Sequence, residues 1–183
     1  MGRVRSTALK SILSTCELRG LDPDILYRKS KMFLESYREL CWATLKNEDC
    51  FSMDSFAASE AQMRQALKYL TDISGNEDKI VFTQNMSRLF DSRWILELTD
   101  TSMIHVREFP FGGPLFFEIL SKYYLVSVKY SEGEVLSNLN MERSRFYDRK
   151  KEAILIFGLT LWGTVIPKTL KMLETARDYP IDI

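Results

Sequence analysis

The chain has 183 residues and a mass of 21.4 kDa, a length that favours one domain or one domain with a small appendage. Hydrophobic residues make up 45% and charged residues 27%, which excludes a mostly disordered chain. The 25 Lys and Arg residues balance the 25 Asp and Glu residues, so the formal net charge is zero. This excludes a uniformly basic surface, and any DNA binding has to come from a local patch.

Three cysteines and one histidine limit the redox and metal chemistry of the chain. Cys16, Cys41 and Cys50 form no C-x-x-C pair, and their odd number argues against a disulfide framework, so we expect a reduced, cytoplasmic protein. His105 and the cysteines lack the close spacing of zinc ligands, so we predict no metal and no cofactor. Without a P-loop, nucleophile elbow or Gly-rich dinucleotide turn, the chain is not expected to be an enzyme.

Hydrophobic periodicity predicts helices in the N-terminal half. Leu9, Ile12 and Leu13 fall on one stripe and indicate a short helix before the break at residues 20–23. Residues 24–46 are expected to form a long helix, with apolar residues at spacings of three and four on its buried face: Phe33, Tyr37, Leu40, Cys41 and Leu45. Another helix is predicted over residues 59–73, because Ser59 and Gln62 have the S-x-x-Q spacing of a capping box.

Residues 76–113 are open to two interpretations. Residues 94–98 and 103–109 are strand-like runs separated by turn-forming residues, and 79–83 is β-branched, which favours a small β-hairpin. The alternative is a helix over residues 86–98. Prolines and glycines at 110–114 end the segment. A further helix is predicted from Pro114 to about Val126, since proline suits the first turn of a helix.

The spacing of residues 130–157 is typical of a helix-turn-helix. Ser131 and Glu134 form an S-x-x-E capping box that opens a short helix. Asn140 stands where the chain must turn, because asparagine tolerates the left-handed backbone conformation. A second helix is expected from about Glu142, with Phe146 as the bulky residue that is buried where the two helices meet.

The second of these helices carries an excess of positive charge. Between Glu142 and Glu152, five Arg and Lys residues and three acidic residues leave a local charge of +2. Arginine can pair bidentately with guanine, and lysines one turn further on suit phosphates. The predicted DNA-binding residues are Arg143, Ser144, Arg145, Tyr147, Asp148, Arg149, Lys150 and Lys151. The competing interpretation is a solvated face whose charges only stabilise the helix.

Residues 139–154, LNMERSRFYDRKKEAI, resemble the ArpU family of phage-type transcriptional regulators, which carry a C-terminal helix-turn-helix related to region 4 of sigma factors. Phe146-Tyr147 followed by residues 150–153 looks like a motif of that family, and residues 33–40 and 119–125 are similar to its other helices. Asp148 departs from the family, where a basic residue is more usual, and Arg149 stands in place of an apolar one. The resemblance implies a regulator of late genes on a prophage or other mobile element.

Residues 153–166 form the longest uncharged run, which is shorter than the ~20 residues that span a bilayer, so no membrane association is predicted. A helix that is apolar all round needs burial on every side, either in the domain core or against a second subunit. We favour a homodimer through this segment, because two-fold symmetry would double the weak basic patch.

Together these features predict a mainly α-helical bundle with a C-terminal helix-turn-helix. Residues 1–113 would form an N-terminal helical region with an irregular insertion, and residues 114–183 the DNA-binding region. The predicted function is a sequence-specific transcriptional regulator that binds double-stranded DNA. The alternative is a protein-interaction module that contacts RNA polymerase or a phage packaging component without reading bases.

Overall fold

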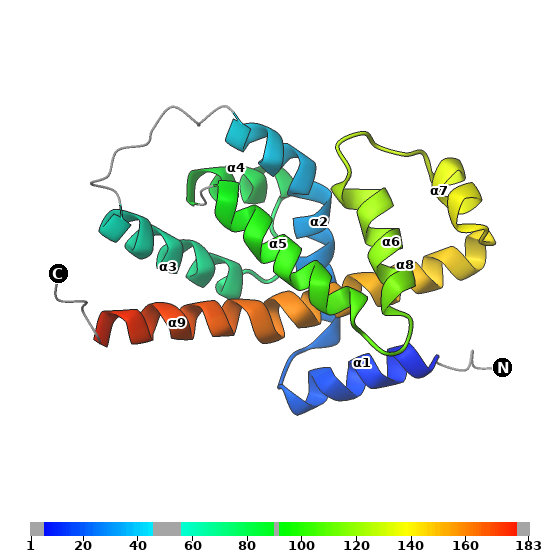
Figure 1. Ribbon diagram of the computed structural model, residues 1–183, viewed down its shortest axis with the longest axis horizontal. Helices are drawn as coiled ribbons and strands as arrows, with labels where there is room; N and C mark the ends of the chain where they lie inside the picture. Colours follow the sequence, from blue (N-terminus) through cyan, green and yellow to red (C-terminus); the bar gives the residue numbers. More distant parts are fainter. Residues whose placement is uncertain (1–5, 46–55, 90–91, 179–183) are drawn as a thin grey trace.

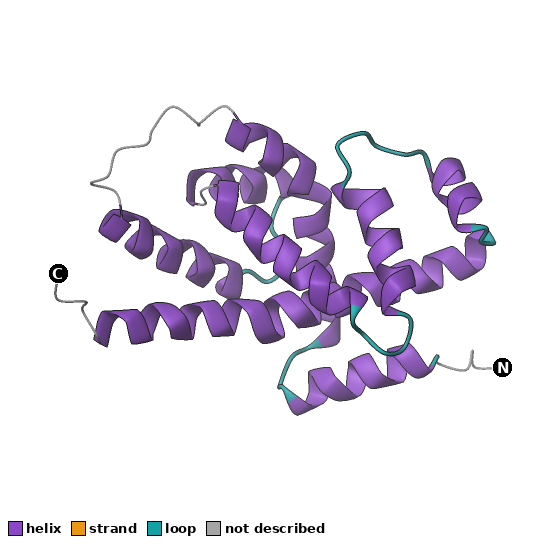
Figure 2. Cartoon of the chain, viewed as in Figure 1, coloured by secondary structure: helices purple, strands orange, loops and turns teal. Residues whose placement is uncertain are grey.

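The computed structural model describes residues 6–45, 56–89 and 92–178. Within these ranges most residues are helical and none is in a strand, so the predicted mainly α-helical fold is confirmed (Figure 2). The helices in chain order are α1 (Thr7–Leu18), α2 (Pro23–Leu45), α3 (Phe56–Asp72), α4 (Lys79–Leu89), α5 (Ser92–Arg107), α6 (Gly113–Leu120), the π-helical turn η2 (Ser121–Leu125), α7 (Glu132–Leu139), α8 (Arg143–Thr160), the π-helical turn η3 (Leu161–Val165) and α9 (Ile166–Asp178).

One long rod of helix organises the molecule. α8 continues through η3 into α9, and this rod runs along the length of the molecule (Figure 1). α1, α2, α5 and α6 pack around α8, while α3 packs on α9. Every residue from 152 to 162 is buried. The fold of a single chain therefore supplies the burial that this apolar helix requires on all sides.

Two expectations about the uncharged run depend on this burial. By length and composition alone, the helix Arg143–Thr175 could cross a membrane, since its most apolar window has a mean hydropathy of 1.6. However, 67% of that window is buried inside the fold, as in the core helix of a soluble protein. A second subunit is also not needed to bury residues 153–166, because neighbouring helices of the same chain cover most of this segment. Dimerisation stays a prediction without that support.

The same packing joins the two predicted regions. One hydrophobic core contains Phe33 and Leu67 from the N-terminal part together with Phe116 and Phe157 from the C-terminal part. The ring centroids of Phe33 and Phe157 are 5.9 Å apart, and Trp162 meets Phe33 edge-on at 6.2 Å. The division at residues 113 and 114 stays a prediction, but the parts on its two sides share a core.

The helices predicted in the N-terminal part are present, with one incorrect boundary. The hydroxyl of Ser6 caps α1 by accepting the Leu9 amide N–H at 3.0 Å, and Ile12 is fully buried on the predicted stripe. α2 matches the predicted long helix as far as Leu45, and residue 46 lies outside the described residues. α3 already begins at Phe56, so Ser59 lies inside a helix and the capping box predicted there is wrong. The S-x-x-Q spacing also occurs within helices, where it has no capping role.

The β-hairpin that the sequence favoured within residues 76–113 is wrong. In this segment α4 ends at Leu89 and α5 begins at Ser92, and residues 90–91 lie outside the described residues. The alternative of a helix over residues 86–98 is therefore confirmed for its described parts, 86–89 and 92–98. Ile95, Leu98, Ser102 and Val106 are buried on one face of α5, at spacings of three and four. Burial of this face against α6 and α8 therefore outweighs the strand preference of the individual side chains.

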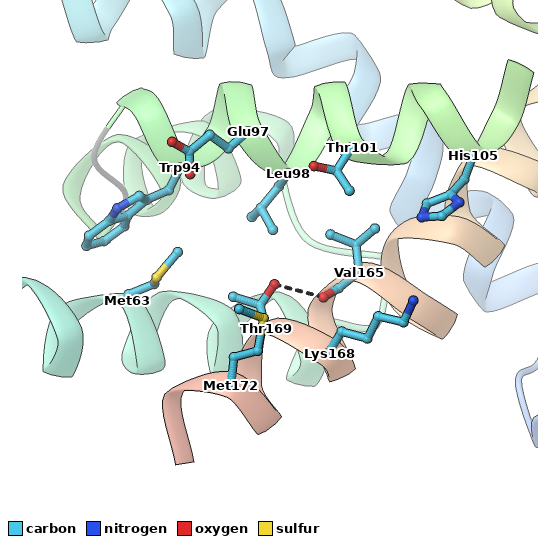
Figure 3. Close-up of a pocket in the computed structure, with 10 residues that line it drawn as sticks. All are labelled: Met63, Trp94, Glu97, Leu98, Thr101, His105, Val165, Lys168, Thr169 and Met172. Carbon is cyan, nitrogen blue, oxygen red and sulfur yellow. Dashed lines mark hydrogen bonds between the residues drawn. The ribbon is translucent and has the colours of Figure 1, made fainter. Parts of the chain in front are cut away.

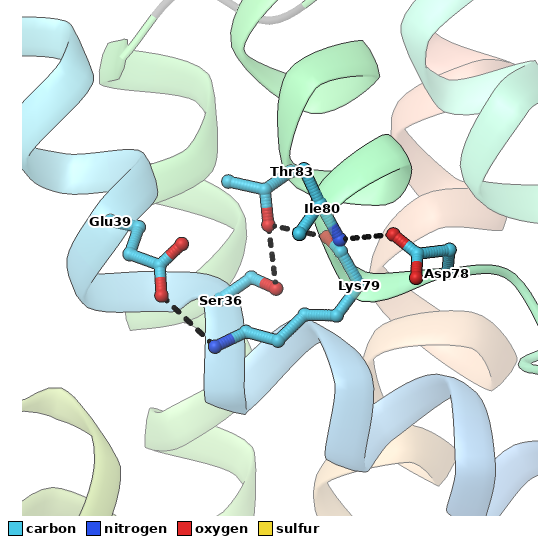
Figure 4. Close-up of polar contacts among 6 residues, drawn as sticks. All are labelled: Ser36, Glu39, Asp78, Lys79, Ile80 and Thr83. Atoms are coloured by element: carbon cyan, nitrogen blue, oxygen red, sulfur yellow. Dashed lines mark hydrogen bonds and ion pairs between the residues drawn. The ribbon is translucent and has the colours of Figure 1, made fainter.

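Capping and contacts with α2 stabilise α4 at residues that looked strand-like (Figure 4). The carboxylate of Asp78 accepts two amide N–H groups of the first turn, at 2.8 and 3.2 Å. Lys79 donates to the carboxylate of Glu39 on α2 at 2.9 Å, and the hydroxyl groups of Thr83 and Ser36 lie 3.0 Å apart. The β-branched run thus begins a capped helix that is attached laterally to α2.

Pro167 lies two residues after the π-helical turn η3, in the first turn of α9. Proline has no N–H, so the carbonyl of Gly163, four residues earlier, lacks its usual helical donor. Arg19 at the end of α1 supplies a substitute, because its guanidinium donates to the Gly163 carbonyl and, at 2.8 Å, to the Thr164 hydroxyl. The irregular turn therefore also attaches α1 to the central rod.

Candidate nucleic-acid interface

The backbone of the predicted motif lies at one end of the molecule, where α7 stands beside the first turns of α8 (Figure 1). The hydroxyl of Ser131 accepts the Glu134 amide N–H at 3.3 Å, and the Glu134 carboxylate accepts the Ser131 amide N–H at 2.7 Å. Asn140 ends α7 in the left-handed conformation, with φ 47° and ψ 49°. α8 begins at Arg143, directly after Glu142. The capping box, the turn residue and the helix start are therefore confirmed.

Aromatic side chains attach this corner to the bundle. Phe146 is fully buried, as predicted, and its ring centroid lies 6.0 Å from that of Tyr123 on η2. Val135 on α7 is fully buried as well. The guanidinium of Arg38 on α2 donates to the carbonyl oxygens of Tyr123 and Val126 at 2.8 and 2.7 Å. These bonds hold the end of η2, against which α7 packs.

Four of the eight predicted DNA-binding residues share an exposed face of α8. Arg143, Tyr147 and Lys151 follow one another at intervals of four, and Ser144 lies beside them on the same side of the helix. All four are exposed, and the side chain of Arg143 is 73% exposed. The ammonium nitrogen of Lys151 also lies 5.8 Å from the ring centroid of Tyr27 on α2, so this side chain lies toward the bundle as well as toward solvent.

Glu132 on α7 lies against this face. Its carboxylate accepts the hydroxyl of Tyr147 at 2.6 Å and pairs with Nε of Arg143 at 2.8 Å. The hydrogen bond from Tyr147, followed by the charge of Arg143, holds the pKa of the Glu132 carboxyl below its ordinary value. The same hydrogen bond raises the pKa of the Tyr147 phenol. One acidic residue thus joins two predicted DNA-binding residues to α7.

Arg149 faces α1 and not the exposed side of α8. Its guanidinium pairs with Glu152 at 2.6 Å, and the side chain of Glu152 is only 6% exposed. The Ser6 hydroxyl, at the start of α1, donates to the other carboxylate oxygen of Glu152. Because a buried carboxylate needs such partners, this arrangement gives Arg149 a structural role.

Lys150 also folds back onto the protein. Its ammonium nitrogen lies 3.8 Å from the centroid of the Tyr123 ring and within reach of three further rings, those of Tyr124, Phe146 and Tyr147. An ammonium group over aromatic faces gains about 0.5–2 kcal/mol from the cation–π interaction. Lys150 therefore helps to attach α8 to η2 in the free protein.

The fold brings additional acidic residues to the predicted basic patch. Arg145 is exposed at the end of α8, and no ion pair joins it to another described residue, whereas Asp148 is half-buried. The positive residues here are Arg143, Arg145, Arg149, Lys150 and Lys151, and the acidic residues on the two helices and the turn between them are Glu132, Glu134, Glu142, Asp148 and Glu152. Charge is therefore balanced over this corner, and only the positions of individual side chains distinguish its faces.

The first turn of α8 is open to an anionic group. The side chain of Glu142, which stands in the N-cap position, makes no hydrogen bond to that turn. The first amide N–H groups of a helix have no partner within the helix, and the helix dipole makes this end positive. The exposed side chains of Arg143 and Arg145 lie beside these amides. Together they can bind a phosphate oxygen.

Sequence reasoning missed Glu132 and Tyr123. Glu132 directly follows Ser131 of the predicted capping box, and Tyr123 lies within the helix predicted from Pro114 to about Val126, but no pattern in the sequence assigns either residue a role in the site. Their roles depend on contacts between separate helices, and no sequence pattern indicates such contacts. Comparison with family models, with curated proteins and with solved structures finds no match to this chain.

Proposed function

We propose that the chain is a transcriptional regulator that binds double-stranded DNA through the first turn and the exposed face of α8. The observation that carries the proposal is the open first turn of α8, where unbonded amide groups lie beside the exposed side chains of Arg143, Ser144 and Arg145. A helix that presents its N-terminal turn at a free end of the molecule has the arrangement that major-groove recognition helices use. On the family resemblance given above, the regulated genes would be late genes of a phage or mobile element.

The predicted DNA-binding residues would have three different roles: reading bases, contacting phosphates and holding α8 in place. Arg143 and Arg145 would read base edges or flanking phosphates, with Ser144 and Tyr147 as nearby hydroxyl donors. Lys151, two turns into α8, would contact a phosphate and contribute affinity without sequence information. Arg149 and Lys150 would act by holding α8 on the bundle, since their charged groups are bound to Glu152 and Tyr123.

Removing both exposed arginines tests this proposal. Selection from random duplexes would first identify a preferred site, and fluorescence anisotropy at one fixed salt concentration would then compare Arg143→Ala/Arg145→Ala with the wild type. Because one bidentate arginine contact contributes ~1–3 kcal/mol of discrimination, we expect affinity for the selected site to fall at least about tenfold.

The matched control removes two exposed lysines far from this corner, Lys68 on α3 and Lys171 on α9. Lys68→Ala/Lys171→Ala loses the same charge, so it should reduce affinity much less than the double arginine variant. Equal losses in the two variants would indicate a general electrostatic effect. Unchanged affinity in the arginine variant, with helical content preserved, would contradict the proposal.

A protein-interaction module is the second candidate function, and the balanced charge of the α7–α8 corner favours it. A surface on which acidic and basic residues alternate suits a protein partner such as RNA polymerase better than a polyanion. Failure of every selected duplex to bind at low salt, together with binding of purified RNA polymerase that Arg143→Ala/Arg145→Ala abolishes, would favour this candidate over the first.

A further inference from the structure

A cavity of about 290 Å³ lies far from the α7–α8 corner, between α5, α3 and the start of α9 (Figure 3). One wall is a continuous face of α5, because its lining residues recur at spacings of three and four. The opposite wall is the corresponding face of η3 and α9, and Met63 of α3 closes one side. The lining residues are Met63, Trp94, Glu97, Leu98, Thr101, His105, Val165, Lys168, Thr169 and Met172.

Most of the lining is apolar and adaptable. Trp94 and Leu98 on the α5 wall face the side of the cavity that Val165, Met172 and Met63 supply from η3, α9 and α3. Methionine side chains are flexible and polarizable, so they adjust to ligands of different shape. The volume lies near the lower end of the range for small-molecule sites. This part of the cavity suits a hydrocarbon chain or a single aromatic ring.

The basic and acidic side chains of the cavity lie at opposite ends of it. His105 and Lys168 lie together at one end, whereas Glu97 lies near Trp94 at the other (Figure 3). In the described part of the chain, no salt bridge involves Lys168, His105 or Glu97. The hydroxyl of Thr101 lies between the two ends. A ligand whose anionic group meets Lys168 and His105 would therefore complete an unpaired basic end.

From this arrangement we infer that the cavity binds a small apolar anion, a carboxylate that carries a hydrocarbon chain or an aromatic ring. The hydrocarbon part lies between the methionines and Trp94, and the carboxylate pairs with Lys168 and His105. Because α5, α3 and α9 all contribute to the cavity, the ligand stabilises their packing. The inference does not depend on the proposed DNA binding, since no residue of the exposed face of α8 lines the cavity.

Ligands that differ in chain length and in the charge of the head group test the inference with the wild-type protein. Isothermal titration with sodium octanoate and sodium decanoate measures the contribution of two methylene groups, and decylammonium chloride reverses the charge of the head group. We expect decanoate to bind roughly tenfold more tightly than octanoate, because each buried methylene contributes ~0.8 kcal/mol. Decylammonium should bind at least tenfold more weakly than decanoate. Equal binding of decanoate and decylammonium would overturn the inference.

Variants locate the site. Lys168→Glu should weaken decanoate binding at least tenfold, whereas Lys171→Glu, on the exposed side of the same helix, should leave it within about twofold. Thr101→Trp should fill the cavity from an exposed position on α5 and abolish binding without altering helical content. Equal effects of the two lysine variants, or normal binding by Thr101→Trp, would overturn the inference. Conversion of a dimer to a monomer by Thr101→Trp would show that the cavity is a self-association surface, and this too would overturn it.

Discussion

Because α8 packs closely on α2, a residue larger than glycine at position 158 should destabilise the protein. A Cβ atom added there would lie 2.9 Å from Cγ of Leu26 and would overlap the hydroxyl oxygen of Ser30. Ser30 is fully buried and donates to the Leu26 carbonyl at 2.6 Å, so its hydroxyl cannot turn away without losing that bond. In an unconstrained helix, Gly→Ala would be stabilising by about 1 kcal/mol. Here the overlap should cost ~1–3 kcal/mol and the lost hydrogen bond about 1 kcal/mol more.

We therefore expect Gly158→Ala to reduce the free energy of unfolding by about 1–3 kcal/mol, measured by urea denaturation with circular dichroism. Gly133→Ala on α7 is the matched control, because no atom lies within 4 Å of an added Cβ there. It should raise stability by about 0.5 kcal/mol. In the double variant Ser30→Ala/Gly158→Ala, removal of the hydroxyl should recover part of the loss, so the two effects should not add. If Gly158→Ala is as stable as the wild type, the close packing of α8 on α2 is wrong.

Three further predictions concern the α7–α8 corner and the thiols. Glu132→Gln should free Arg143 from α7, so DNA affinity should rise and the slope of log affinity against log salt concentration should steepen by about 0.9. Glu134→Gln, which keeps the S-x-x-Q cap, should change neither the affinity nor this slope. Because the pKa of Glu132 is lowered in the folded protein, its contribution to stability is present above the ordinary carboxyl pKa and is lost as the pH falls through the lowered value. Wild-type protein should accordingly lose more stability than Glu132→Gln in acid denaturation, and parallel curves would contradict this. Burial raises the pKa of both the Cys16 and the Cys41 thiols, but Cys16 is fully buried and Cys41 only half-buried, so native-state alkylation followed by mass spectrometry should label Cys41 before Cys16.

Short-range signals predicted the start and end of several helices correctly. The Ser131–Glu134 capping box and the left-handed Asn140 involve residues that are close in the sequence, so their chemistry can be read directly. The apolar stripe of α2 was predictable for a similar reason, because its period is that of the helix itself. By contrast, Ser59 has the same spacing of residue types as Ser131 and lies inside α3. A capping motif thus predicts a helix better than it predicts the first residue of that helix.

Residues 76–113 show how the fold can override local preference. Short β-branched and aromatic runs favoured strands, yet Ile95, Leu98 and Val106 are buried at helical spacing. Polar Ser102 interrupts that stripe, and its hydroxyl donates to the Leu98 carbonyl at 2.7 Å within the helix. Because this bond satisfies the hydroxyl locally, a polar residue can occupy a buried helical position. Because the sequence places Ser102 among the turn-forming residues between two strand-like runs, it does not reveal the helical period.

The candidate interface was predictable as a segment but not as a surface. Arg143 and Arg149 differ little in sequence context, yet one is exposed and the other pairs with a buried carboxylate that also binds Ser6. Ser6 and Glu152 are separated by 146 positions, so the contact that makes Arg149 structural has no local signal. Lys150 is likewise held over the ring of Tyr123, a residue of a different helix. The fold therefore decides which charges on α8 remain available to a partner.

α8 changes from surface to core within one residue, since Lys151 is exposed and Glu152 is buried. The same helix thus presents the candidate interface and fills the centre of the bundle. Because a helix is stiff over this length, the direction of Arg143 and Tyr147 depends on how residues beyond Glu152 pack against α2 and α6. Gly158 lies four turns from Arg143 and touches no part of the interface, yet a larger residue there must displace α8 from α2. Substitutions in the core half of α8 should consequently alter binding through the orientation of the exposed face, even where the charges of that face are unchanged.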